Sequence, residues 1–242
     1  MRRITGDSER AREDYDRMGD AYADDSYSDP VKVGYERPAM LAMAGEVRGK
    51  RVLDAGCAAG ALSRALAERG ARVAGMDLNE RFIERARANV GSDAEFHVAD
   101  ISKPMPFFAS GSFDIVTASL VLHYLEDWDA PLREFHRVLA AGGALLISTH
   151  HPMQDVNVST PPTPYFEKRL LTDVWNKGGR EYKVRYYRRP LGAIVDALAA
   201  AGFVIERMPE PRPDPAAFTD APDLYAQIAA APFFLFIRAL KR

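Results

Sequence analysis

Carboxylates and glycines recur where short apolar runs of the chain end. Asp54 closes one such run and leads into a turn that contains Gly56 and Gly60. Asp77 and Asp100 each close a later run. Glycines let the backbone approach a ligand closely, and a carboxylate at that point attracts a cation or accepts hydrogen bonds from hydroxyl and amino groups. The spacing therefore indicates a binding site for a nucleotide-like cofactor that carries positive charge.

The same turn departs from the fingerprint of dinucleotide-binding proteins. That fingerprint requires three glycines in the pattern G-x-G-x-x-G, whereas Ala58 stands between Gly56 and Gly60 here. Asp54 would repel a pyrophosphate but attract a sulfonium or ammonium group. A cationic cofactor is therefore favoured. An NAD-linked oxidoreductase and a catalytically degenerate domain that only binds its ligand stay open as alternatives.

Three of the five histidines follow the ends of expected strands, namely His123, His150 and His151. A histidine near neutral pH can remove a proton from a substrate or orient it, so these three are the candidate catalytic residues. His97 and His136 fall within an expected strand and helix, where structural roles are favoured. The adjacent pair His150-His151 could join a metal site, but no matching carboxylate spacing supports this, and no metal is predicted.

The elements that position these residues follow from hydrophobic periodicity. From residue 50 onward, short apolar runs alternate with helical patterns, which is typical of an α/β protein with a doubly wound, Rossmann-like parallel sheet. Ligands bind such sheets outside the carboxyl ends of the strands. The expected helices are 61–69, 80–90, 131–139 and 191–201. The third of them is expected to stop at Gly142-Gly143. The expected strands are 51–54, 72–76, 95–99, 113–118, 144–149, 203–208 and 233–240, giving a seven-stranded sheet whose last two strands form an antiparallel edge.

Two segments lie outside this regular alternation. Residues 1–46 are predicted to be an N-terminal helical lid over a single domain at 47–242, and residues 150–190 an inserted substrate cap after the fifth strand. The cap is rich in aromatic residues, which with Arg185, Arg188 and Arg189 could line a pocket for a planar or anionic small molecule. Alternatively, these residues form core and a solvated face.

Composition and net charge exclude some classes of binding partner. The formal net charge is -2 for 242 residues, so the basic footprint of most nucleic-acid binders is missing and no nucleic-acid partner is expected. A single cysteine, Cys57, fits a reducing compartment, and the first residues lack the apolar stretch of a secretory signal. The longest apolar run is about ten residues, too short to span a bilayer. A cytoplasmic protein without a membrane partner is expected, and its oligomeric state is left undetermined.

Several segments resemble, in order, the motifs of class I S-adenosylmethionine-dependent methyltransferases, specifically the type 11, UbiE-like small-molecule group. They are Val52 to Gly60, Gly75 to Leu78, Asp100-Ile101, Phe113 to Val116 and Leu139 to Gly143. Ala58 departs from the usual glycine. The resemblance implies methyl transfer from S-adenosyl-L-methionine to an oxygen, nitrogen or carbon of a small-molecule acceptor, with S-adenosyl-L-homocysteine as product.

The resemblance also implies roles for individual residues. Each is carried over by its place in the matching motif. The implied cofactor-binding residues are Asp54, Ala55, Gly56 and Gly60 beside the methionine moiety, Asp77 on the ribose, Leu78, Asp100 and Ile101 at the adenine, Ser119 and Leu120 under the methionine end, and Tyr15 and Tyr22 on a lid.

Overall fold

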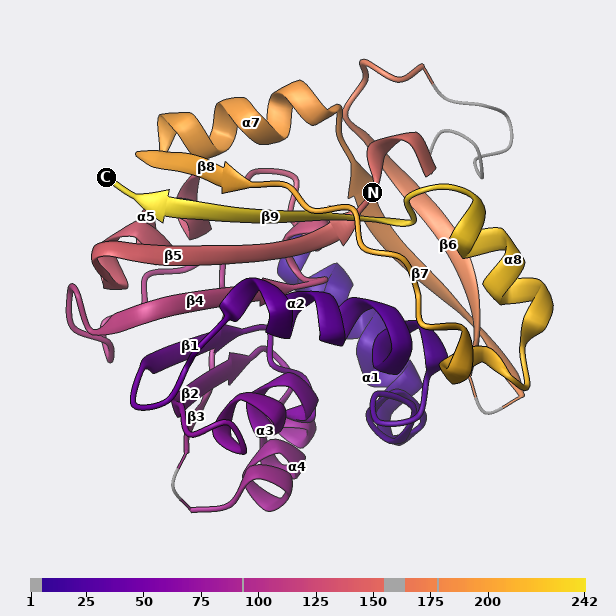
Figure 1. Ribbon diagram of the computed structural model, residues 1–242, viewed down its shortest axis with the longest axis horizontal. Helices are drawn as coiled ribbons and strands as arrows, with labels where there is room; N and C mark the ends of the chain where they lie inside the picture. Colours follow the sequence, from indigo (N-terminus) through magenta and orange to yellow (C-terminus); the bar gives the residue numbers. More distant parts are fainter. Residues whose placement is uncertain (1–5, 93, 155–163, 178) are drawn as a thin grey trace, which may run out of the picture.

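The computed structural model describes residues 6–92, 94–154, 164–177 and 179–242. Its centre is a seven-stranded sheet in the order β3-β2-β1-β4-β5-β9-β8 (Figure 1). The strands are β1 Arg51–Ala55, β2 Arg72–Asp77, β3 Glu95–Val98, β4 Phe113–Ser119, β5 Leu139–His150, β8 Phe203–Arg207 and β9 Phe234–Lys241. Strands β1 to β5 are parallel, and β9 runs antiparallel to both of its neighbours, β5 and β8. The predicted doubly wound sheet with an antiparallel pair at its edge is confirmed, with β9 lying one strand in from that edge.

Helices cover both faces of the sheet, and a two-stranded hairpin stands beyond the ends of its parallel strands (Figure 1). None of the helices in the described residues is both long and apolar enough to cross a membrane. The hairpin consists of β6 Arg169–Lys177 and β7 Arg180–Arg188. The main helices are α1 Asp7–Asp25, the π-helix η1 Lys32–Glu36, α2 Arg37–Ala44, α3 Ala61–Ala67, α4 Glu80–Val90, α5 Asp129–Val138, α7 Leu191–Ala200 and α8 Pro222–Ala230.

Alternation along the central strands divides the core between the two faces of the sheet. In β1, Leu53 packs in the cluster that includes residues of α5 and α7, whereas Val52 packs in the cluster with α2 and α3. Val116 and Ile115 of β4 divide in the same way. Successive side chains of a strand point to opposite faces, so a continuous apolar run such as Val52-Leu53 serves two buried faces at once.

One predicted boundary is wrong. The helix expected at 131–139, stopping at Gly142-Gly143, is α5 and ends at Val138, and β5 begins at once with Leu139, which pairs with Phe113 of β4. Gly142 has a φ of 70° and lies within β5, where the pairing with β4 shifts register between Leu139 and Ala144. Tertiary pairing with β4 therefore ends the helix before the glycines do.

Helix α1 is held against the hairpin by buried charge. The Arg185 guanidinium of β7 donates to Asp14 at 2.7 Å and 3.0 Å, and the Asp14 side chain is only 1% exposed. At the hairpin's other end, Lys177 pairs with Asp25 and Asp29, on and just after α1. Ion pairs that are screened from water hold elements more firmly than exposed ones. Helix α1 and the β6–β7 hairpin thus form one covering layer.

Candidate active site

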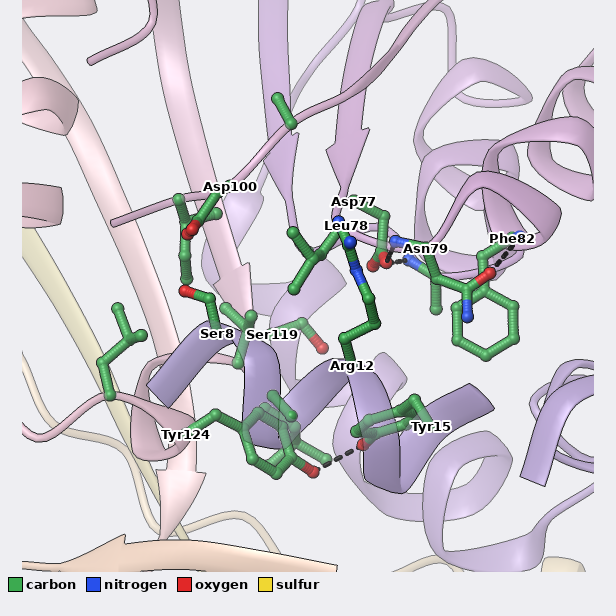
Figure 2. Close-up of a pocket in the computed structure, with 18 of the residues that line it drawn as sticks. Ser8, Arg12, Tyr15, Asp77, Leu78, Asn79, Phe82, Asp100, Ser119 and Tyr124 are labelled. Carbon is green, nitrogen blue, oxygen red and sulfur yellow. Dashed lines mark hydrogen bonds between the residues drawn. The ribbon is translucent and has the colours of Figure 1, made fainter. Parts of the chain in front are cut away.

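A pocket of about 710 Å³ lies between the carboxyl ends of β1 to β4 and the overlying helix α1 (Figure 2). We call it the strand-end pocket. Its floor is formed by the residues that follow the strands, and its roof by side chains of α1. Nine residues predicted from the sequence line it, namely Tyr15, Tyr22, Gly56, Asp77, Leu78, Asp100, Ile101, Ser119 and Leu120.

The turn after β1 brings backbone to the edge of this pocket. Gly56 has a φ of 77°, and a Cβ there would lie 2.5 Å from the side chain of Val121, so only glycine fits. Gly60 caps α3 with a φ of 82°, and its missing Cβ lets α3 approach Ala86 of α4. Ala58 holds a φ of 46° without being glycine, which costs about 1–2 kcal/mol for an L-residue.

Asp54 is buried beneath this turn, with 1% of its surface exposed. Both of its carboxylate oxygens accept hydrogen bonds, from the hydroxyl of Ser63 at 2.6 Å and from that of Thr117 at 2.8 Å. Burial raises the pKa of the carboxyl, although these hydroxyls partly offset it. Asp54 therefore joins β1, α3 and β4 at the point where the turn begins.

Asp77 closes β2 and faces the strand-end pocket (Figure 2). Its two carboxylate oxygens accept from the backbone N–H groups of Ala58 and Asn79, each at 2.9 Å. Burial raises the pKa of this carboxyl to about 6. The Asn79 side chain accepts from the N–H of Phe82 at the start of α4 and donates to Asp16 of α1. The end of β2 is thereby joined to the turn after β1 and to the roof.

Asp100 follows β3 on the far side of the same pocket and faces Ser8 of α1 in Figure 2. Its carboxylate accepts from the N–H of Ser102 at 2.8 Å, and the hydroxyl groups of Ser102 and Ser8 lie 3.3 Å apart. Arg12 extends from α1 toward Leu78 (Figure 2). Ser8 and Arg12 are pocket residues that the sequence analysis did not identify.

Aromatic side chains form a wall between the strand-end pocket and another pocket that contains His123 and His150. The Tyr15 ring meets the Tyr22 ring edge to face at 4.8 Å and the Tyr124 ring at 5.4 Å. The hydroxyl groups of Tyr15 and Tyr124 are hydrogen-bonded (Figure 2). Burial raises the pKa values of Tyr15 and Tyr124 well above 10, so both phenols stay protonated at neutral pH.

A second pocket, about 490 Å³, opens beside the turn after β1, and we call it the Glu36 pocket. Lys32, Glu36, Arg37 and Asp54 line it. Glu36 is 4% exposed, and one of its oxygens accepts from the hydroxyls of both Ser119 and Ser148. Burial raises the pKa of its carboxyl. Two carboxyl groups and two cationic side chains thus face one small volume.

The sequence analysis identified Asp54 but missed Lys32, Glu36 and Arg37 of the Glu36 pocket. Lys32 and Glu36 lie on the π-helix η1, and Arg37 follows it at the start of α2. π-Helices are rare and frequently occur at functional sites. A sequence pattern cannot reveal one, because its wider turn is set by packing rather than by residue periodicity.

A third pocket, about 910 Å³, lies on the other side of the tyrosine wall, and we call it the histidine pocket. His123 and His150 line it, with ring centroids 4.6 Å apart. His123 is 1% exposed, and burial together with nearby His150 lowers its pKa well below 6.5. Its Nε2 has no hydrogen-bond partner within the described part of the chain, whereas Nδ1 lies 3.5 Å from the Thr149 hydroxyl. Two of the three candidate histidines are therefore together in one pocket.

Some expected residues lie elsewhere. His151, Ala55 and Gly60 line none of these three pockets. The described residues also contain no group of three or more histidine, cysteine or acidic side chains placed to hold a metal ion.

The three arginines considered for an anion pocket are engaged in the covering layer. Arg185 pairs with Asp14, as described above. Arg188 is fully buried and donates to the backbone carbonyls of Pro164, Tyr165 and Glu167. Arg189 donates to the Leu125 carbonyl and stacks over Trp128 at 4.2 Å. The structure therefore supports the interpretation in which these arginines belong to the core and a solvated face rather than to an anion pocket.

Comparison with known proteins adds independent findings. Residues 53–147 match the family described as methyltransferase domain. A crystal structure of an S-adenosylmethionine-dependent methyltransferase from Mesorhizobium loti is 31% identical, with a TM-score of 0.66, over 84% of this chain and 96% of that one.

Two further matches bear on the reaction and on the fold. A ubiquinone biosynthesis O-methyltransferase from Pseudomonas aeruginosa is 37% identical over 107 residues, which span 42% of this chain and 44% of that protein, less than half of its length. The magnesium protoporphyrin IX methyltransferase of Synechocystis, crystallised with bound S-adenosylhomocysteine, shares the fold with a TM-score of 0.64 at 20% identity, over 98% of this chain and all of that one.

Proposed function

The chain belongs to the S-adenosylmethionine-dependent methyltransferases, and we propose that it methylates a small-molecule acceptor held in the histidine pocket. The observation that carries this proposal is the meeting of the three pockets. The strand-end, Glu36 and histidine pockets share two lining residues, Tyr22 and Leu120. We expect the methyl group to pass at that junction.

The strand-end pocket fits the nucleoside part of the cofactor. Its lining combines a small number of carboxylates at the strand ends with apolar and aromatic side chains, as ligand pockets do. Asp77 offers carboxylate oxygens for the two ribose hydroxyls, and Asp100 offers an acceptor for the exocyclic amine of adenine. Leu78 and Ile101 supply apolar surface beside the base.

The Glu36 pocket fits the zwitterionic methionine end. Its positive charge at Arg37 faces a carboxylate, and its acidic groups at Glu36 and Asp54 face an ammonium. Beside the junction, the Tyr15 ring suits a cationic sulfonium, because aromatic rings attract cations through their quadrupole.

S-Adenosylmethionine supplies a methyl group activated on a sulfonium and leaves as S-adenosylhomocysteine. The lone pair of the acceptor forms the new bond to the methyl carbon, and the electron pair of the broken carbon–sulfur bond stays on sulfur. The protein must hold the acceptor in line with that bond and keep water away, and such positioning can remove about 7–11 kcal/mol of a reaction barrier. The α1 roof and the tyrosine wall would do both.

An acceptor that carries a proton on its nucleophilic atom also needs a base. His123 stays neutral at physiological pH because its pKa is lowered, so its ring can accept that proton. Its buried Nε2, which lacks a partner among the described side chains and backbone, is the candidate atom. His150 lies beside it and would orient the acceptor. His151 lines none of the three pockets. It remains a candidate only because it follows His150 in the chain.

Two considerations support a small molecule and an oxygen nucleophile. The histidine pocket lies under the covering layer of α1 and the β6–β7 hairpin, which supports residues 1–46 as a lid and 150–190 as a substrate cap. A concave pocket lined in large part by aromatic side chains suits a metabolite better than a macromolecule. The Pseudomonas relative is named as an O-methyltransferase, which favours oxygen as the methylated atom.

The proposal is tested by incubating the protein with S-adenosylmethionine labelled on its methyl carbon and a small-metabolite extract. Label should appear in small organic products. Calorimetry should show binding of S-adenosylhomocysteine and none of NADH, which separates this function from the NAD-linked alternative. Cofactor binding without turnover on any acceptor would favour a degenerate binding module. Label found in tRNA or protein, with none in small molecules, would contradict a small-molecule acceptor.

A further inference from the structure

Lys32 stands at the boundary between the Glu36 pocket and the histidine pocket, and it lines both. Its Nζ lies 3.7 Å from the centroid of the Tyr22 ring, beside the junction of the three pockets. Within the described residues its ammonium makes no hydrogen bond and no ion pair. Its three N–H donors are therefore available at the place where donor and acceptor meet, while its charge also favours the ionised carboxylates of Asp29 and Glu36.

The other charges on that side of the histidine pocket are already matched. Asp29 accepts from the backbone N–H of Val31 with one oxygen and from the Lys177 ammonium with the other, at 2.9 Å and 2.7 Å. Lys177 also pairs with Asp25. The pairing with Lys177 lowers the pKa of Asp29 although burial opposes it. This cluster has little capacity left for a ligand.

Asp173 of β6 is the remaining acid that faces the pocket. One of its oxygens accepts from the N–H of Val174 at 2.8 Å, and the other from the indole N–H of Trp175 at 2.9 Å. Opposite it, Nε2 of His123 has no partner among the described residues. Among the charged and histidine side chains described above, the Lys32 ammonium and Nε2 of His123 have no hydrogen-bond partner in the described residues, and the ammonium can only donate.

Aromatic rings form a large part of the walls of the histidine pocket. Rings line it on several sides, from α1, the short helix after β4, the hairpin and the start of β9. An aromatic ligand packs well against such rings, which prefer offset or edge-to-face contact. The aromatic lining residues are Tyr15, Tyr22, Tyr124, Trp175, Phe233 and Phe234.

We infer that the acceptor is a planar aromatic molecule that bears a carboxylate, and that Lys32 binds this carboxylate. The inference rests on the proposed function and specifies its substrate class. An anion at Lys32 matches the free donors, and it also offsets the repulsion between the Lys32 ammonium and a cationic donor at the same junction. Arg37 lines only the Glu36 pocket and is left to hold the methionine carboxylate.

Three probes of similar ring size and different charge test the charge preference, namely benzoate, benzamide and benzylamine. Their binding to the protein saturated with S-adenosylhomocysteine is compared by ligand-observed NMR titration. Benzoate should bind at least about tenfold more tightly than benzamide, the effect of one charge-assisted hydrogen bond. Lys32→Gln should remove that preference, and Lys32→Arg should keep it. Lys183→Gln is the matched control, because Lys183 is an exposed lysine of β7 outside the pocket.

Three outcomes would overturn the inference. Benzylamine binding more tightly than benzoate would assign the pocket to amines and to Asp173. A benzoate preference that survives Lys32→Gln would remove Lys32 from its recognition. If Lys32→Gln instead weakens S-adenosylhomocysteine while the ratio of benzoate to benzamide is unchanged, Lys32 serves the donor rather than the acceptor.

A fractionated extract separates failure of this inference from failure of the proposed function. The small-metabolite extract is divided on an anion exchanger at neutral pH before the methyl-transfer reaction. Acceptor activity in the retained fraction, with a KM that rises in Lys32→Gln, supports an anionic acceptor. Activity confined to the flow-through would reject the anionic acceptor and leave the small-molecule methyltransferase intact. Activity in neither fraction would reject both.

Discussion

Replacing Asp77 with asparagine should weaken the binding of S-adenosylhomocysteine without unfolding the protein. The Asp77 carboxylate faces the strand-end pocket, and its oxygens already accept from the N–H groups of Ala58 and Asn79. An asparagine keeps one acceptor oxygen and replaces the other by a donor, so one charge-assisted hydrogen bond to the ribose is lost. Such a bond contributes about 1.5–3 kcal/mol, which corresponds to a loss of affinity of about 10- to 150-fold.

The same residue predicts a pH dependence of cofactor binding. Burial raises the pKa of Asp77 from 3.8 to about 6 in the free protein. Ribose hydroxyls donate to the ionised form, so binding requires the proton to leave. With a pKa of about 6, roughly ten in eleven molecules are ionised at about pH 7 and one in eleven at about pH 5. Affinity should therefore fall about tenfold over that interval, and binding at about pH 6 should release protons.

Folding stability should respond in the opposite direction. Because the pKa of Asp77 is higher in the folded protein than the ordinary 3.8, the neutral carboxyl is favoured by folding. The stabilisation from this group is present below about pH 4 and is lost as pH rises through about pH 6. Denaturant unfolding of the free protein across this range measures its contribution.

Calorimetric titration with S-adenosylhomocysteine at several pH values measures the affinity and the proton release together. Asp196→Asn is the matched control, since Asp196 is exposed on α7, away from the three pockets. Unchanged affinity in Asp77→Asn would refute the assignment of Asp77 to the ribose. If the parent protein binds S-adenosylhomocysteine with the same affinity at about pH 5 and at about pH 7, the ionisation of Asp77 does not control binding.

Three further outcomes are expected. His123→Ala or His150→Ala should lower turnover by more than about tenfold with cofactor affinity unchanged, and parent rates in both variants would leave positioning alone to explain catalysis. Ala58→Gly should raise the free energy of unfolding in urea by about 0.5–1 kcal/mol by relieving the strain of a positive φ, and an unchanged midpoint would contradict that strain. Arg185→Ala should speed hydrogen exchange of α1 amides by leaving the buried Asp14 carboxylate without its cation, while exchange as slow as in the parent would show that this ion pair does not hold the lid.

Local sequence determined the central sheet and the acids at its carboxyl ends. Runs such as Val52-Leu53 supply an apolar side chain to each face of a buried strand, and that pattern is visible without any distant contact. Asp77 and Asp100 then reach the strand-end pocket because every parallel strand ends at the same edge of the sheet. Helix α4 was equally predictable at 80–90, where its amphipathic pattern begins after Asn79 and ends at Gly91.

Tertiary structure decided the features that depend on residues far apart in the chain. The end of α5 at Val138 is set by pairing of Leu139 with Phe113, which overrides the glycine signal at Gly142. Arg185 reads from sequence as a candidate anion ligand, but Asp14, 171 positions away, already pairs with it.

The charged residues Glu36 and Lys32, near the junction of the three pockets, also could not be predicted from the sequence. Glu36 faces the Glu36 pocket where Ser119 and Ser148 converge on it from two strands. Lys32 begins the π-helix η1, and its ammonium lies over the Tyr22 ring at the edge of the histidine pocket. Periodicity reports the environment of a residue along its own element, whereas the partner that satisfies a charge, or leaves it free for a ligand, is determined when separate elements pack together.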